Sequence, residues 1–433
     1  MNALAEELNR SLEGKSAGKL LSRLGRRMYF PKGILSQSAE AGEKAKRFNA
    51  TVGMAFSHGE PMALDVVLEH LPGLSRREAV AYAPTSGVQA TRTAWKAELV
   101  KKNPSLSGKP FSLPVVVPGL TAGISYLADL FIEEGDSVVV PDMFWPNYRL
   151  IVEERKQARF ASYRFFTAEG GFNVAGMEKA AIESSAASKK AVVILNYPNN
   201  PTGYTPSVAE AGAIRDALVR LADSGVDVLV ILDDAYFGLQ YEPDNLRESM
   251  FAFLAGAHPR ILAAKVDGQT KEDYVWGFRG GFVTFANPAL DEKGYDALIK
   301  KLMGVVRSSV SNATAPTQHI LAKAMAQPRY AEQKSRFSEI LEGRYKAVKR
   351  FIASRPAPEG FKALPFNSGY FMCFECEGFS AEALRLKLLE ERGIGVISIQ
   401  DTWLRVAFSS VDEEDLETMY SEIYEAAASM TRA

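Results

Sequence analysis

A lysine and an arginine stand eight residues apart in a glycine-containing stretch, where both could act on one ligand. Lys271 is followed by Arg279, which lies among Gly277, Gly280 and Gly281. A lysine in a dry cleft loses its proton more readily and can attack an aldehyde. A guanidinium on the same loop can hold a dianion by paired hydrogen bonds, and glycines let backbone and ligand come close. The spacing indicates an aldehyde that carries a phosphate, although alone it also fits two solvated charges on a loop.

The composition is that of a soluble globular protein. A length of 433 residues predicts about two or three domains. With 51 basic and 52 acidic residues the net charge is −1, so we expect neither a nucleic acid nor an anionic membrane as partner. No apolar run approaches the roughly 18 residues of a membrane span. Residues 1–27 mix acidic and basic side chains without the apolar core of a signal peptide, which favours a cytoplasmic location.

Neither the cysteines nor the histidines indicate a metal site. Cys373 and Cys376 have the C-x-x-C spacing, but they lie in an apolar stretch that reads as a strand. No second cysteine or histidine pair stands near them, so we expect neither zinc nor a redox pair. The four histidines are scattered along the chain: His58, His70, His258 and His319.

The elements that must position Lys271 follow a repeating pattern of strand and helix. Short apolar runs predict strands at residues 114–118, 136–141, 191–195 and 226–232. Helical patterns separate them, including one over residues 208–222. This alternation predicts a doubly wound α/β domain with a mostly parallel sheet. In such sheets, ligands bind outside the carboxyl ends of the strands.

Several polar or aromatic groups fall at these predicted strand ends. The turn Gly119-Leu120-Thr121 opens a helix after a strand, and a helix N-terminus can bind a phosphate. Trp145 follows the next strand and could stack on a flat ligand, although such aromatics are more often part of the core. Asn200 and the run Asp233 to Tyr236 follow two further strands. The coincidence of these positions carries more weight than any one residue.

Together these motifs resemble the class I/II aminotransferases, which are fold type I pyridoxal-phosphate enzymes. Residues 200–203 match the family's Asn-Pro-x-Gly, and residues 233–236 match its Asp-x-Ala-Tyr. Lys271 and Arg279 reproduce its Lys and Arg spacing, and the resemblance runs from about Phe48 to the C-terminus. The sequence Trp-Pro-Asn at residues 145–147 is similar to the aspartate/aromatic branch.

The resemblance implies a large pyridoxal-phosphate-binding domain and a smaller α+β domain built from both termini. We expect an N-terminal arm with part of the small domain at residues 1–62. The large, doubly wound domain then covers residues 63–339, and the C-terminal small domain covers residues 340–433.

The resemblance also implies roles for single residues. Lys271 would hold pyridoxal phosphate as a Schiff base and then shuttle a proton. Asp233 would keep the pyridine nitrogen protonated. Tyr236 and Asn200 would bind the ring oxygen, and Trp145 would stack on the ring.

Further implied contacts concern the phosphate and the substrate. Arg279 and the turn Gly119-Leu120-Thr121 would bind the phosphate, with Tyr82 reaching it from the other subunit of a homodimer. Arg405 would bind the substrate α-carboxylate and Gly53 would lie under the substrate. Arg307 would bind a distal carboxylate across the dimer, although it could instead cap the preceding helix.

Three positions depart from the family pattern. Gly268 stands where a serine is usual, so one hydroxyl contact to the phosphate is missing. Tyr148 stands where the aspartate branch has a histidine, which puts that support of Asp233 in doubt. The phosphate turn is Gly-Leu-Thr rather than Ser-Gly-Thr, so it must rely more on backbone N–H groups.

Lys265 is the alternative Schiff-base lysine, but it lacks the spacing to the arginine.

The expected activity is amino transfer between an L-amino acid, aspartate/glutamate or aromatic, and a 2-oxo acid such as 2-oxoglutarate. The expected cofactor is pyridoxal 5'-phosphate, with no metal. A carbon–sulfur lyase or a decarboxylase of the same fold shares the cofactor site, and the residues alone leave these alternatives open.

Overall fold

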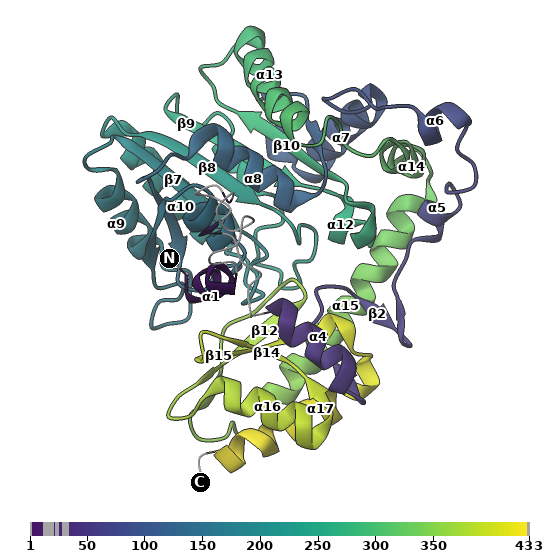
Figure 1. The fold of residues 1–433 in the computed structure, drawn as a ribbon, viewed down its shortest axis with the longest axis vertical. Coiled ribbons are helices and arrows are strands. Elements are labelled where there is room, and N and C mark those ends of the chain that lie inside the picture. Colours follow the sequence, from purple (N-terminus) through teal and green to yellow (C-terminus); the bar gives the residue numbers. More distant parts are fainter. Residues whose placement is uncertain (1, 12–20, 22–25, 28–33, 431–433) are drawn as a thin grey trace.

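A seven-stranded sheet forms the centre of the larger part of the molecule (Figure 1). The computed structural model describes residues 2–11, 21, 26–27 and 34–430. The strand order is β4-β10-β9-β8-β7-β5-β6. The strands are β4 (Val115–Val117), β10 (Gly281–Ala286), β9 (Ile261–Asp267), β8 (Asp227–Asp233), β7 (Lys190–Asn196), β5 (Ser137–Pro141) and β6 (Arg159–Tyr163).

All neighbouring pairs in this sheet are parallel except those made by β10, which is antiparallel to both β4 and β9. The fold type I α/β prediction is therefore confirmed, with a mixed central sheet. The predicted helix at residues 208–222 is present as α10 (Val208–Asp223), which begins with a capping box between Ser207 and Glu210.

Helices cover both faces of the sheet because successive strand residues point to opposite sides. On one face, Val192 and Ile194 of β7 join a core with α8 (Leu120–Phe131) and α13 (Glu292–Ser309). On the other face, Val193 and Leu195 join a second core. That core contains residues of α7 (Gln89–Lys102), α9 (Val174–Ser185), α10 and α14 (Ala315–Met325).

Segments from both ends of the described chain build a smaller unit. Its antiparallel sheet has the order β11-β12-β15-β14, with β11 (Phe361–Ala363), β12 (Phe371–Cys376), β15 (Trp403–Ala407) and β14 (Ile397–Ile399). Figure 1 shows α4 (Ile34–Lys44) beside α16 (Ala381–Arg392) and α17 (Glu413–Met430). β1 (Phe48–Asn49) pairs in parallel with β13 (Ile394–Gly395).

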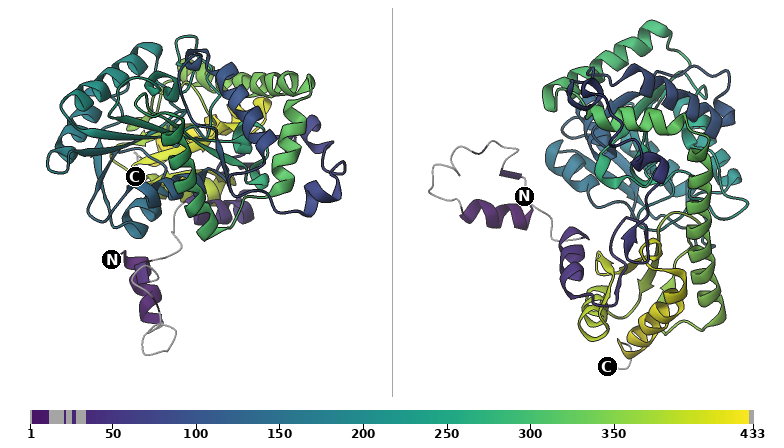
Figure 2. Two further views of the ribbon diagram at one scale, coloured as in Figure 1. Left: turned by 90° about the horizontal axis from the view of Figure 1, so that it is seen from above. Right: turned by 90° about the vertical axis from the view of Figure 1, so that its right-hand side faces the viewer.

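One long helix, α15 (Arg329–Ser354), runs from the larger part of the molecule to the smaller unit (Figures 1 and 2). The border expected between residues 339 and 340 falls inside this continuous helix. The borders at 62 and 339 remain predictions, and part of the expected N-terminal arm lies outside the described residues.

The remaining elements are short. They are α1 (Ala3–Ser11), β2 (Phe56–Ser57), β3 (Glu60–Pro61), α5 (Asp65–Leu68), α6 (Arg76–Val80), η1 (Pro104–Leu106), the π-helical η2 (Leu150–Arg155), α11 (Met250–Leu254), α12 (Gln269–Glu272), η3 (Trp276–Phe278) and η4 (Phe408–Ser410). Among the helices of the described residues, none combines the length and the apolar character needed to cross a membrane.

Candidate active site

Lys271 lies on α12, a single helical turn that follows β9 at the edge of the sheet. Gly268 precedes this turn, and a Cβ atom built on it would lie 2.6 Å from the carbonyl oxygen of Gly280 and 2.8 Å from Cα of Gly281. The backbone that follows Arg279 thus returns against Gly268 and leaves no room for a side chain. This close approach is the physical reason for glycine where the family usually has serine.

The Lys271 side chain is half-buried, and its amine lacks a close carboxylate. Its Nζ lies 4.9 Å from the centroid of the Tyr236 ring. Burial lowers the pKa of Lys271 to about 8, with Asp233 raising it and Arg279 lowering it further. An amine with this pKa has a substantial neutral, nucleophilic fraction slightly above neutral pH, which fits attack on an aldehyde.

Asp233 ends β8 and has one carboxylate oxygen held and one free. Tyr148 donates its hydroxyl hydrogen to Oδ2 at 2.5 Å, so the doubt raised by the histidine-to-tyrosine departure is removed. Within the described residues, Oδ1 is buried and has no hydrogen-bond partner. Burial raises the pKa of Asp233 to about 6, whereas the Tyr148 hydrogen bond and Lys271 lower it. A protonated ring nitrogen would supply the missing donor, so this group fits the pyridine of the cofactor.

Arg405 of β15 reaches across from the smaller unit to the sheet edge. Its Nη1 donates to Oδ1 of Asn200 at 2.9 Å, and its Nη2 donates to the backbone oxygen of Thr51 at 2.9 Å. Its Nε is buried without a partner among the described residues. The guanidinium carbon lies 4.3 Å from the centroid of the Phe371 ring. A buried guanidinium with an unused N–H can accept a carboxylate.

Gly53 and Tyr236 complete this part of the site. A Cβ atom on Gly53 would lie 3.5 Å from the Tyr236 hydroxyl and 3.6 Å from the Phe371 ring, so the glycine backbone lies close against both. Burial raises the pKa of Tyr236, while Arg405 and a side-chain hydrogen bond with Asn200 lower it. The structure therefore brings Gly53, Asn200, Tyr236 and Arg405 together.

The predicted phosphate seat forms where α8 begins. Gly119 has φ of +90° and caps the helix that starts at Leu120. A Cβ atom on Gly119 would lie 2.5 Å from Nη2 of Arg279, so only glycine allows the arginine to lie over this helix N-terminus. The Leu120 side chain is buried, while Thr121 is half-buried. A helix N-terminus beside a guanidinium fits a phosphate dianion.

Trp145 is half-buried beside Tyr148, the residue that donates a hydrogen bond to Asp233. Its ring meets the Tyr148 ring edge to face, with centroids 5.4 Å apart and an interplanar angle of 85°. Sequence reasoning singled out Trp145 but missed Tyr148 as a donor. The available signal was a hydroxyl-bearing aromatic three residues after Trp145, directly beyond a buried strand.

Two predicted residues do not join this cluster within one chain. Tyr82 is 92% exposed on the loop after α6. Arg307 is exposed in the last turn of α13, where its Nη1 donates to the Ser311 hydroxyl. The alternative lysine, Lys265, is buried in ion pairs with Asp234 and Asp267.

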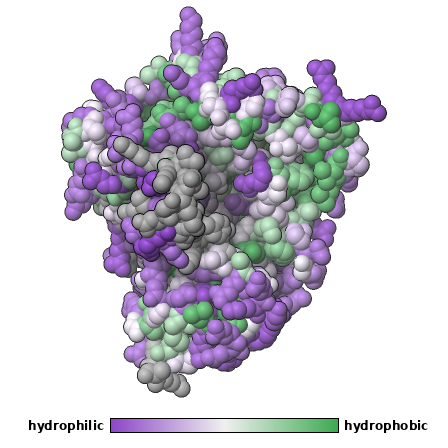
Figure 3. All heavy atoms as spheres, viewed as in Figure 1, coloured by the Kyte–Doolittle hydropathy of each residue, from purple (hydrophilic) through white to green (hydrophobic). Residues whose placement is uncertain are grey.

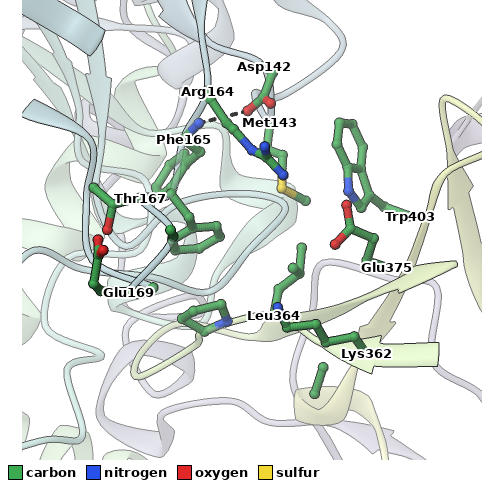
Figure 4. A pocket seen from close by; sticks show the side chains of 15 residues that line it. Asp142, Met143, Arg164, Phe165, Thr167, Glu169, Lys362, Leu364, Glu375 and Trp403 are labelled. Carbon is green, nitrogen blue, oxygen red and sulfur yellow. Dashed lines mark hydrogen bonds between the residues drawn. The ribbon is translucent and has the colours of Figure 1, made fainter. Parts of the chain in front are cut away.

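A cavity of about 830 Å³ lies apart from Lys271, between the ends of β5 and β6 and the small sheet (Figure 4). Figure 4 shows Trp403 and Glu375 on the small-sheet side and Arg164 on the other side. Neither Lys271 nor Asp233 lines it. Among the described residues, no group of three or more histidine, cysteine or acidic side chains could hold a metal ion. Cys373 and Cys376 are buried free thiols.

Comparison with known proteins identifies the family of the chain. The family Aminotransferase class I and II matches residues 53–423. An aspartate aminotransferase of Bacillus sp. (strain YM-2) is 23% identical over 327 residues, which is 73% of this chain and 75% of that protein. An aromatic-amino-acid aminotransferase 2 of Thermococcus litoralis is 26% identical over 253 residues, 57% of this chain and 58% of that protein.

Among solved structures, an aminotransferase from Anaerococcus prevotii superimposes with a TM-score of 0.82 at 22% identity and covers 93% of this chain and 98% of its own. The family match and the fold together define a fold type I pyridoxal-phosphate enzyme. The chain belongs to the aminotransferase class I and II family, and its activity is pyridoxal-phosphate-dependent amino transfer.

Proposed function

We propose that the cluster of Lys271, Asp233 and Arg405 carries out the amino transfer. The observation that carries this proposal is the Asp233 carboxylate, which is held at Oδ2 by Tyr148 and free at the buried Oδ1. When bound, pyridoxal phosphate supplies an electron sink for the amino acid. Asp233 would hold its protonated ring nitrogen, and Lys271 would hold its aldehyde carbon and would act as a general base once released.

The residues around this cluster orient the cofactor. Gly119, Leu120 and Thr121 offer the helix N-terminus to the phosphate, and Arg279 neutralises its charge. Trp145 would stack on the ring. Asn200 and Tyr236 would bind the ring oxygen, and the hydrogen bond between their side chains shows that they lie close enough to do so together.

Chemical trapping tests the central assignment. We expect borohydride reduction of the holoenzyme, followed by peptide mapping, to place the pyridoxyl label on Lys271. The Lys265→Met variant should keep the label at that position, and Lys271→Ala should lose it. A label on Lys265 in the wild-type protein would overturn the assignment.

The substrates we propose are aspartate or glutamate, or an aromatic amino acid, with a 2-oxo acid such as 2-oxoglutarate. The names of the relatives support this class. The free Nε of Arg405 supports its role in binding the α-carboxylate, above Gly53. A carbon–sulfur lyase or decarboxylase would turn over one amino acid continuously. We expect instead that an amino acid without an oxo acid converts the bound cofactor once and then stops.

The distal carboxylate of a dicarboxylic substrate would bind Arg307 of the partner subunit. The exposure of Arg307 supports this role, since no carboxylate of its own chain pairs with it among the described residues. We expect Arg307→Leu to lower kcat/KM for aspartate and glutamate at least about a hundredfold, roughly 2.7 kcal/mol. Alanine should be little affected. The control is Lys300→Met on the same helix, where an exposed ion pair with Asp296 is removed. Equal losses for alanine and aspartate would make Arg307 structural.

A homodimer would bring Tyr82 and Arg307 to the site of the other subunit. Exposed apolar side chains support it: Leu68, Leu71 and Val80 stand at or near α5 and α6. Figure 3 shows apolar atoms along the side of the molecule where Figure 1 places α5 and α6. Mixing Lys271→Ala and Tyr82→Phe chains should restore activity in heterodimers, and no recovery above the single variants would count against shared sites.

The location we propose is the cytoplasm. The nearly even balance of charges and the two free cysteines support it. Cell fractionation tests this assignment, and recovery of the protein with a secreted or membrane fraction would contradict it.

A further inference from the structure

The two residues that follow Lys271 are buried carboxylates. Glu272 is 8% exposed and Asp273 is fully buried. Acidic side chains are seldom buried unless partners compensate their charge, because removal from water disfavours the ionised form. Neither residue belongs to the cofactor contacts proposed above, so their burial directly beside Lys271 needs another explanation.

Two lysines and a tyrosine from distant helices compensate these carboxylates. Oε1 of Glu272 accepts hydrogen bonds from Lys102 of α7 and from Lys334 of α15, the latter at 2.8 Å. Oδ1 of Asp273 accepts from the Tyr330 hydroxyl at 2.6 Å, and Lys334 lies 2.9 Å from the same oxygen. Burial alone would raise the pKa of Glu272, but the ammonium groups of Lys102 and Lys334 lower it to about 2. Glu272 therefore stays ionised, and it links α7 to α15 through α12.

Backbone hydrogen bonds from Asp273 and Tyr274 close the turn that carries Lys271. The backbone N–H of Asp273 donates to the carbonyl of Gln269 at 2.9 Å, and that of Tyr274 donates to the carbonyl of Lys271 at 3.3 Å. A helix of one turn has few internal hydrogen bonds, so it depends on tertiary contacts for its geometry. Anchoring the side chains of Glu272 and Asp273 therefore fixes the backbone of Lys271.

The network also reaches beyond the larger part of the molecule. Tyr330 and Lys334 lie in the first turns of α15, which continues into the smaller unit (Figure 2). That unit carries Arg405 on β15, so α15 connects the turn of Lys271 with the part of the molecule that carries the proposed carboxylate-binding arginine. Movement of the smaller unit would be transmitted to α12 through these contacts.

We propose that Glu272 and Asp273, held by Lys102, Tyr330 and Lys334, form a positioning network that fixes Lys271 relative to Asp233 and couples its turn to α15. The proposal rests on the assignment of Lys271 as the cofactor-binding lysine. A purely structural network would give a different result, since its loss would lower stability without changing the environment of the Lys271 amine.

Neutral variants of the same shape test the proposal. The variants are Glu272→Gln and Asp273→Asn. A third variant, Lys334→Met, removes the lysine that pairs with both carboxylates and is more exposed than either of them. The matched control is Glu98→Gln, which removes a carboxylate paired with exposed Lys101 at the rim of the cavity of about 430 Å³ beside the network. One readout is hydrogen exchange of the amides at residues 272–275 in the holoenzyme. The other is the pKa of Lys271 in the cofactor-free protein, from the pH dependence of its modification by an amine-reactive reagent.

The charged groups around Lys271 give the sign of the second readout. Asp233 at the end of β8 raises its pKa, and Arg279 after α12 lowers it. Glu272→Gln leaves Lys102 without its carboxylate partner, while Lys334 keeps Asp273. Because one negative charge is lost from the residue next to Lys271, we expect the pKa of Lys271 to fall by about 0.5 unit or more in Glu272→Gln.

We also expect amide exchange at residues 272–275 to accelerate at least about tenfold in Glu272→Gln and Asp273→Asn, and less in Lys334→Met. The control should match the wild type in both readouts. Unchanged exchange together with an unchanged Lys271 pKa, even with a lower melting temperature, would overturn the positioning role. If Glu272→Gln does not fold, the same outcomes in Lys334→Met decide. A borohydride label on another lysine would instead overturn the proposed function, independently of this result.

Discussion

Two lysines six residues apart lie in different surroundings: Lys265 is buried and Lys271 is half-buried. Lys265 is 1% exposed and lies in ion pairs with Asp234 and Asp267, the latter at 3.3 Å. Burial alone would lower its pKa, but these carboxylates raise it above its usual value. Lys271 faces the Tyr236 ring instead, and no carboxylate of the described residues lies within ion-pair distance. Burial lowers its pKa to about 8.

The comparison shows that burial by itself does not activate a lysine. Desolvation acts on both side chains, and the presence or absence of a paired carboxylate decides which amine stays charged. Lys265 is a structural cation whose charge is balanced by two aspartates. At Lys271, burial lowers the pKa more than the nearby carboxylate raises it. Such a lowered pKa is what a lysine needs to act as a nucleophile near neutral pH.

The largest expected effect separates the two lysines by activity. Replacing Lys271 with alanine removes both the nucleophile and the proton carrier, so we expect steady-state transamination to fall at least about ten-thousand-fold, roughly 5.5 kcal/mol. The melting temperature should not decrease. Lys265→Met should retain a measurable fraction of the rate in whatever protein folds. Comparable losses of activity in both variants would erase the functional distinction.

The second effect separates them by stability. Lys265→Met leaves the Asp234 and Asp267 carboxylates without their cation, so we expect the free energy of unfolding to fall by about 3–5 kcal/mol. Urea denaturation of the cofactor-free protein measures this change. Lys300→Met is the control, since its exposed pair with Asp296 should contribute less than about 1 kcal/mol. A loss no larger than that of the control would mean that Lys265 does not hold the two aspartates.

The third prediction is that removing Lys271 raises the free energy of unfolding, whereas removing Lys265 lowers it. In the cofactor-free protein its pKa of about 8 lies below the value of about 10.4 for an unfolded chain, so the unfolded state binds more protons between these pH values. Wild-type stability should therefore rise with pH in this window. We expect Lys271→Met to be more stable than wild type by about 1–3 kcal/mol at pH 7, with the gain shrinking from pH 8 to 10.5. A pH-independent difference would contradict the desolvation of Lys271.

The smallest effect concerns Asp233, the carboxylate that raises the pKa of Lys271 and that we expect to bind the cofactor. Tyr148→Phe removes the hydrogen bond to Oδ2 and should raise the pKa of Asp233 above about 6. We expect kcat/KM to fall about tenfold, roughly 1.4 kcal/mol, with the acid limb of its pH profile moving upward. Tyr148→His should restore the donor and most of the rate. An unchanged acid limb in Tyr148→Phe would show that this hydrogen bond does not act on Asp233.

Much of the fold followed from local patterns. The apolar runs at residues 191–195 and 226–232 predict buried parallel strands, and these are β7 and β8. The positions of Asp233 and Asn200 at or just after their ends also followed, because parallel strands end at a common edge. The contacts of Tyr148, Gly268 and Glu272 could not be predicted, since each depends on a partner from another segment.

The family motifs could be recognised from residue types and spacing alone. The eight-residue spacing to Arg279 also favoured Lys271 over Lys265 as the Schiff-base lysine. Residue types also determined that a glycine replaces serine at position 268. Only the tertiary structure decided that Gly280 fills that space, that Tyr148 reaches Asp233, and that Lys265 is neutralised by two aspartates. The physical reason is that a motif records neighbours along the chain, whereas pKa values and steric room depend on neighbours in space.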